Sequence, residues 1–150
     1  MAPNWPTLNP EQAFTMERRV QASEIDGFGH VNNAVYLAWL DECAWVHAEA
    51  LGVGLSFALK QGEGFAVAEA TLSYLGSARI DDHVEILTWI VGNDGRNKGL
   101  RVFEVWRDTK LILRARIKYT CINLATLKPT RMSERYHLLF PAFDPPVSCR

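Results

Sequence analysis

The chain has 150 residues, a length typical of one domain, and 48% of them are hydrophobic while 22% are charged. This composition is that of a globular protein, and it excludes disorder or a fibrous state as the working form. With 16 Lys and Arg against 17 Asp and Glu, the net charge of -1 gives no broad cationic surface, so neither nucleic acid nor an anionic membrane is expected as a partner.

The cysteines and the first residues bear on the compartment. Three cysteines, Cys43, Cys121 and Cys149, are too few and too scattered for a disulfide framework or a zinc knuckle. The chain does not start with a basic segment followed by an apolar one, and it has no run of eighteen apolar residues. We therefore expect a cytoplasmic protein that does not enter a membrane.

Both ends of the chain are predicted to be irregular. Residues 1–13 contain three prolines, and the tail from Pro141 contains two more in succession. Between these ends there is no internal repeat and no linker. A single domain, 1–150, with its core at about 15–136, is expected.

The first regular element is a weakly two-faced strand over 15–23, because apolar and polar residues alternate there. Two glycines and two asparagines in residues 24–33 then stop the strand and predict a tight loop. Residues 33–51 lack Pro and Gly and are long enough for a helix of about five turns, with Asn32 or Asn33 as the cap and Gly52 at the end. This helix is apolar nearly all round, which predicts burial on most sides.

The remaining sequence predicts strands near 64–76, 83–92, 99–108 and 110–123, because β-branched and aromatic residues are frequent there. Turn residues at 93–99 and 107–110 indicate antiparallel hairpins. One long helix and about five strands predict an α+β domain whose antiparallel sheet wraps the helix.

The loop before the helix has the pattern expected of a catalytic site. Backbone N–H groups at a helix start carry a partial positive charge and can bind a carbonyl oxygen as it becomes an oxyanion. Asp26 stands seven residues before Asn33, on the other side of a glycine-rich turn. Its carboxylate could act on the same carbonyl as a nucleophile or as a general base for water.

These residues resemble a known family, the hotdog-fold acyl thioesterases of the 4-hydroxybenzoyl-CoA thioesterase type. The resemblance is carried by Asp26 followed by the run from His30 through Val-Asn-Asn to Tyr36 and on to Glu42. It is similar to the corresponding run of bacterial long-chain acyl-CoA thioesterases and, more distantly, of plant acyl-carrier-protein thioesterases. The similarity extends from about Thr15 to Tyr136 and includes the segment 123–132. Spacing of this kind in a strand–loop–helix context is specific.

The resemblance implies a hotdog fold and hydrolysis of an acyl-CoA thioester, with no cofactor because CoA is part of the substrate. It implies that Asp26 is the catalytic carboxylate, that the amide of Asn33 binds the thioester oxygen, and that His30 assists. Phe28 stands where the plant branch has an asparagine, which favours CoA esters over carrier-protein esters. The family also implies a homodimer or homotetramer with active sites between subunits.

Each candidate residue also has a structural interpretation. Asp26 could cap a turn, Asn32 and Asn33 could cap the helix, and the helix aromatics could be core. Glu42 could be a catalytic acid as in other hotdog branches, although an ion pair is the simpler account. Glu69 could face the cleft or form a cross-strand pair. Basic residues could hold CoA phosphates, among them Arg79, Arg96, Lys98, Arg101, Arg114, Arg116 and Arg131.

No histidine spacing predicts a metal site, since His47, His83 and His137 form no HxxxH or HExxH motif. Two other functions stay open from the residues alone. One is a hydratase of enoyl- or hydroxyacyl-thioesters using Asp26 and His30, and the other is a non-catalytic module that binds acyl thioesters.

Overall fold

A computed structural model describes residues 13–140, and every structural statement here concerns that range. The elements in chain order are β1 (Phe14–Arg19), a 3-10 turn η1 (Ala22–Glu24), α1 (Asn33–Ala50), α2 (Leu55–Gln61), β2 (Glu63–Tyr74), β3 (His83–Asn93), β4 (Lys98–Arg107), β5 (Lys110–Asn123) and α3 (Glu134–Leu139). Apart from Ala13, the ends predicted to be irregular lie outside the described residues.

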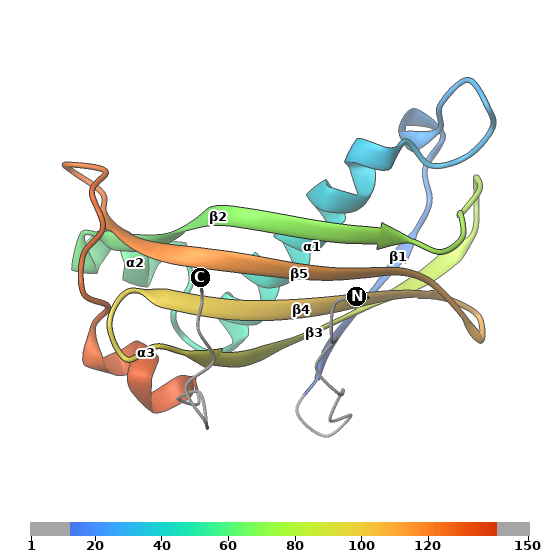
Figure 1. Cartoon of the computed structure of the whole chain (residues 1–150). Helices are drawn as coiled ribbons and strands as arrows, with labels where there is room; N and C mark the ends of the chain where they lie inside the picture. Colours follow the sequence, from blue (N-terminus) through green and yellow to red (C-terminus); the bar gives the residue numbers. More distant parts are fainter. Residues whose placement is uncertain (1–12, 141–150) are drawn as a thin grey trace, which may run out of the picture.

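The strands form one antiparallel sheet of five strands in the order β1-β3-β4-β5-β2. Figure 1 shows α1 crossing one face of this sheet, with the loop before α1 at one end of the molecule and α2 and α3 at the other. The predicted hairpins between β3 and β4 and between β4 and β5 are confirmed. The α+β arrangement with one long helix against the sheet is also confirmed.

Helix α1 begins at the predicted residue, Asn33, and ends at Ala50, one residue before the predicted end. The side chain of Asn32 caps it, because its Oδ1 accepts the N–H of Ala34 at 2.9 Å, and Gly52 follows it with a left-handed φ of 78°. One face of α1 is buried in the main core, through Tyr36, Trp39, Leu40 and Cys43.

The prediction that α1 is buried on most sides is wrong for this single chain. Leu37 is 40% exposed and Val46 is 41% exposed, and Trp45 is exposed as well. Residues four apart lie on one face of a helix, so Leu37, Asp41 and Trp45 form one exposed row. Large apolar side chains of α1 are therefore left exposed in this chain.

Three short elements were not predicted. The strand predicted over 15–23 runs only from Phe14 to Arg19. It ends early because the carboxylate of Glu24 accepts the N–H of Gln21 at 2.9 Å and the chain turns into η1. Helices α2 and α3 cover the other end of the sheet, where Tyr136 packs on Phe57 and Phe65. None of the helices in the described range is long and apolar enough to span a bilayer.

Candidate active site

The segment between Ile25 and Val31 forms a closed loop directly before α1. These two residues form an isolated antiparallel bridge. Inside the bridge, the N–H of Asp26 donates to the carbonyl of His30 at 2.8 Å, and the N–H of Gly29 donates to the carbonyl of Asp26 at 3.1 Å. Gly29 has a left-handed φ of 80°, which glycine adopts at little cost. The backbone therefore fixes where Asp26 lies relative to α1.

Asp26 is half-buried, and its carboxylate is held through one oxygen. Oδ1 accepts the N–H of Phe28 at 2.9 Å and, at a longer 3.4 Å, the N–H of His30. This is the Asx turn that the sequence allowed as a structural role. No hydrogen bond within residues 13–140 reaches Oδ2, so this oxygen is available to a ligand or water.

The start of α1 leaves one amide open. The N–H groups of Ala34 and Val35 are satisfied by the side chain and the carbonyl of Asn32, each at 2.9 Å. The N–H of Asn33 donates no hydrogen bond to any described residue. It lies at the positive end of an 18-residue helix. The hydroxyl of Tyr74 donates to the carbonyl of Asn33 at 2.9 Å and ties the helix start to the end of β2.

The structure thus brings Asp26, His30 and Asn33 into one loop and its helix start. His30 is half-buried and contacts Asp26 through its backbone, whereas its ring makes no hydrogen bond within the described residues. The imidazole is therefore not part of a carboxylate–histidine pair in this chain.

A buried acidic residue, Glu24, holds the loop in place, and sequence analysis missed it. Glu24 accepts hydrogen bonds from the guanidinium of Arg18 and from the indole N–H of Trp39, the latter at 3.1 Å. Its backbone carbonyl accepts the N–H of Asn32 at 2.9 Å. Glu24 therefore links β1, the core of α1 and the helix cap. This linking role of Glu24 depends on Trp39, which is 15 residues away in sequence. No local sequence pattern reveals such a contact.

A cavity in the described part of the chain lies elsewhere. It opens between the second half of α1, α3 and the sheet end made by the start of β2 and by Gly92, Gly99 and Arg101. None of Asp26, His30 and Asn33 lines it. Along α1 it begins at Asp41, roughly 12 Å from Asn33 at 1.5 Å per residue.

Several of the other candidates have structural roles. Glu42 pairs with Arg18 at 2.8 Å, and Glu69 pairs with Lys118 of the neighbouring strand at 3.6 Å. Tyr36 and Trp39 are core, and only Trp45 of the helix aromatics reaches the cavity. Arg101 is buried, so it is not an open surface cation for a CoA phosphate. Within residues 13–140 no three His, Cys, Asp or Glu side chains gather in a way that could hold a metal ion.

Gly29 and Gly27 provide a matched test of the loop geometry. A Cβ at either position would meet no atom within 4 Å, but only Gly29 has a left-handed φ. We expect Gly29→Ala to cost about 1 kcal/mol of stability and to lower the activity of the site at least 10-fold, because the loop must shift. Gly27→Ala should change neither. Thermal unfolding and turnover of the two variants check this, and equal behaviour would contradict it.

Comparison with known proteins identifies the family of the chain. Residues 20–137 match the model of the thioesterase-like superfamily. A chloroplastic acyl-acyl carrier protein thioesterase of Arabidopsis thaliana, ATL3, is 31% identical over 77 residues, which are 51% of this chain and 40% of that protein. The chain therefore spans less than half the length of this plant relative.

Solved structures show the same architecture. The 1,4-dihydroxy-2-naphthoyl-CoA thioesterase Slr0204 from Synechocystis superposes with a TM-score of 0.74 at 20% identity, over 83% of this chain and 92% of that one. A DHNA-CoA thioesterase from Staphylococcus aureus gives 0.76 at 22% identity, over 84% of each chain. The hotdog fold is confirmed, and the family match over 20–137 shows that the chain belongs to the thioesterase-like superfamily.

Proposed function

We propose that this protein is an acyl-CoA thioesterase whose reaction takes place at the loop before α1. The observation that carries the proposal is that two groups without a hydrogen-bond partner in residues 13–140 lie in the closed loop and the helix start that follows it. They are a carboxylate oxygen, Oδ2 of Asp26, and an amide, the N–H of Asn33. CoA is favoured as the thiol because structural relatives are named for CoA esters and because Phe28 departs from the plant carrier-protein pattern.

Hydrolysis needs a nucleophile and a place for the negative charge. As a general base, Oδ2 of Asp26 would take a proton from water while the water oxygen bonds to the thioester carbon. The N–H of Asn33 and the helix dipole would stabilise the oxyanion, and the C–S bond would then break and release the CoA thiolate. As a nucleophile, the same oxygen would form an anhydride that water hydrolyses. Both routes use the same two groups.

A second copy of the chain would complete this site. β2 is an edge strand of twelve residues, and within residues 13–140 it pairs with β5 alone. Long open edges of this kind are templates for pairing with another chain. Antiparallel pairing of two β2 strands would set Tyr74 of one copy, which holds Asn33, beside the Phe65 end of the other, where the cavity opens. We propose a homodimer, or a tetramer built from it, with each active site between two chains.

Leu37 and Val46 provide a matched test of this interface, because their exposed fractions are nearly equal, 40% and 41%. Leu37 lies on the same face of α1 as Trp45, which lines the cavity next to β2. Val46 instead lies one turn beyond Glu42, whose partner Arg18 belongs to β1. We expect Leu37→Glu to weaken the dimer at least ~10-fold, because a carboxylate would be buried in an apolar contact. Val46→Glu should leave it intact. Sedimentation over a concentration series measures both, and a monomeric parent protein would contradict the proposal.

Thiol release tests the reaction itself. The substrates are straight-chain acyl-CoAs from acetyl to palmitoyl, together with benzoyl-CoA and phenylacetyl-CoA. We expect release of free CoA from at least one of them. Loss of the enone absorbance of an enoyl-CoA without thiol release would instead indicate a hydratase. Tight binding of a CoA ester without release, unaffected by replacing Asp26, would indicate a binding module.

A further inference from the structure

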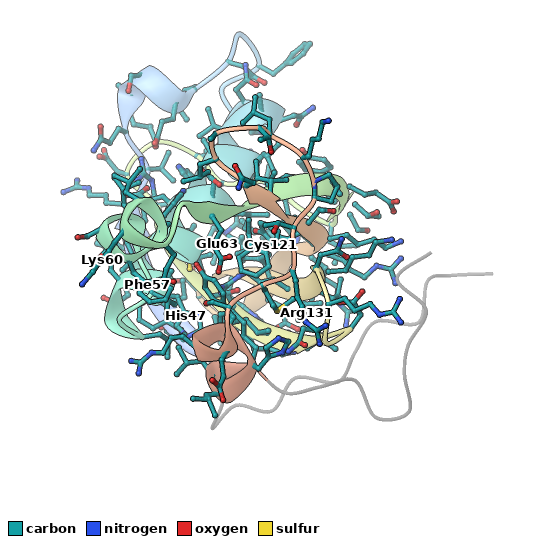
Figure 2. All side chains as sticks on the ribbon, turned by 90° about the vertical axis from the view of Figure 1, so that its left-hand side faces the viewer. His47, Phe57, Lys60, Glu63, Cys121 and Arg131 are labelled. Atoms are coloured by element: carbon teal, nitrogen blue, oxygen red, sulfur yellow. The ribbon has the colours of Figure 1, made fainter. Side chains whose placement is uncertain are left out.

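The cavity beneath the second half of α1 has the size of one aromatic ring. It encloses about 130 Å³, and its walls are mostly apolar, including Ala44, Phe65, Ile90 and Leu100. An engineered apolar cavity of about 150 Å³ binds benzene. Figure 2 shows this end of the molecule, with Glu63 of β2 and His47 of α1 labelled. The carboxylate of Glu63 accepts the N–H of Ser133, which precedes α3.

A buried cation lines this apolar space. Arg101 is 7% exposed, and it forms no salt bridge with any Asp or Glu in residues 13–140. Its two hydrogen bonds both come from Nη1, to Nδ1 of His47 at 2.8 Å and to the hydroxyl of Thr88 at 3.2 Å. Burying a guanidinium without a neighbouring anion costs free energy. This position is therefore a specific binding place for an anion.

His47 does not supply the missing negative charge. Burial, reinforced by the charge of Arg101, lowers the pKa of His47 to about 4, so the ring is neutral at pH 7 and its Nδ1 accepts the hydrogen bond. The ring stacks on Phe14 with centroids 4.9 Å apart. His47 therefore orients the guanidinium and leaves its charge unbalanced.

A second polar group in the cavity wall also lacks a partner. The hydroxyl of Tyr119 is buried and makes no hydrogen bond with any residue in the described range. Burial raises the pKa of Tyr119 to about 12 despite the opposing effect of Arg101, so the group is a neutral donor. A buried tyrosine hydroxyl usually has a partner. Asp41 lines the rim from the exposed face of α1 and does not pair with Arg101.

We infer that this cavity binds a ring-sized apolar group through an acidic oxygen, a carboxylate or a phenolate, which Arg101 pairs with and the hydroxyl of Tyr119 donates to. The ligand is either a free aromatic acid or an acidic substituent on the ring of an acyl thioester. Both present the same chemistry to Arg101. The inference concerns binding by this chain and does not rest on hydrolysis at Asp26.

Benzoate and its neutral isostere benzamide are the probes, titrated into the full-length protein with ¹⁵N amide shifts as the readout. We expect benzoate to shift amides around the cavity, such as those of Gly64, Gly99 and Leu100, and to bind at least 10-fold more tightly than benzamide. Arg101→Met should remove this preference and leave benzamide binding unchanged. Met is close to Arg in length and leaves no buried charge, so the variant is expected to fold.

Tyr119→Phe provides a second variant that removes only the unpartnered hydroxyl. It should weaken benzoate binding about 3-fold to 10-fold without lowering the midpoint of thermal unfolding, because no protein hydrogen bond is lost. A further comparison separates the two sources of the ligand. Hydrolysis of 4-carboxybenzoyl-CoA faster than benzoyl-CoA, with the difference lost in Arg101→Met, identifies an acyl substituent, whereas equal rates identify the free acid.

Two results would overturn the inference. One is equal binding of benzoate and benzamide, and the other is benzoate binding that Arg101→Met leaves unchanged. In either case water would satisfy Arg101 and Tyr119, since a cavity of about 130 Å³ with two polar groups in its wall has room for several molecules. Because the readout is binding, an inactive but folded protein would still decide the question.

Discussion

Asp26→Asn is expected to lower kcat for thioester hydrolysis at least ~1,000-fold while the protein keeps its fold. The asparagine side-chain oxygen can replace Oδ1 and still accept the N–H of Phe28, which Asp26 holds at 2.9 Å. Its amide nitrogen then takes the place of Oδ2, which cannot accept a proton or attack a carbonyl carbon. The substitution therefore removes the proposed chemistry and retains the turn. Thiol release under saturating substrate measures the effect.

Two further variants separate chemistry from loop structure. Asp26→Ala also loses the hydrogen bond to Phe28, so it should be as inactive as Asp26→Asn but less stable by about 1 kcal/mol. His30→Ala should reduce turnover much less, because His30 contacts Asp26 through its backbone. Asp26→Asn with the turnover of the parent protein would show that the carboxylate only shapes the loop.

The parts of the fold that local sequence determines were predicted closely. Helix α1 and strands β2 to β5 end within two residues of their expected bounds, because turn residues and glycines stand at those ends. Helices α2 and α3 have seven and six residues, too few for a helical period to be recognised. Their stability comes from tertiary packing, as with Tyr136 against Phe57 and Phe65.

The functional residues also include some that local sequence could predict and others that it could not. Asp26, His30 and Asn33 belong to one short segment whose contacts are local, so spacing and resemblance suffice to place them together. Arg101 and His47 meet across 54 residues of sequence, and their contact depends on how α1 lies on the sheet. Sequence analysis could name Arg101 only among the basic residues that could hold CoA phosphates. Lys98 and Arg107 stand at the ends of β4, whereas Arg101 stands inside the strand between Leu100 and Val102. That position is the one signal that could have distinguished it.

Glu24 is expected to matter most for stability. Its carboxylate accepts hydrogen bonds from Gln21, Arg18 and Trp39, and its side chain is 11% exposed. Glu24→Ala would leave the guanidinium of Arg18 and the indole N–H of Trp39 without this partner. We expect a loss of about 3 kcal/mol in the free energy of unfolding, or roughly 10 °C in the midpoint. Chemical and thermal denaturation at pH 7 measure it.

Glu42 provides the matched control for Glu24, because it pairs with the same Arg18 at 2.8 Å but is 51% exposed. Glu42→Ala should cost less than about 0.5 kcal/mol, as exposed pairs do. A loss from Glu42→Ala as large as that from Glu24→Ala would show that total charge around Arg18, rather than burial of Glu24, stabilises this corner of the fold.

The pH dependence of stability gives the Glu24 prediction a second readout. Burial raises the pKa of Glu24, but its hydrogen bonds with Gln21, Trp39 and Arg18 outweigh burial and hold the pKa below its ordinary value of 4.5. The folded state therefore binds this proton less readily than the unfolded state. The stabilisation is fully present above about pH 5 and is lost as the pH falls through the folded pKa. The stability difference between the parent protein and Glu24→Ala should accordingly shrink on acidification, and a difference that stays constant from pH 7 to pH 3 would show that the ionised carboxylate is not what stabilises the loop.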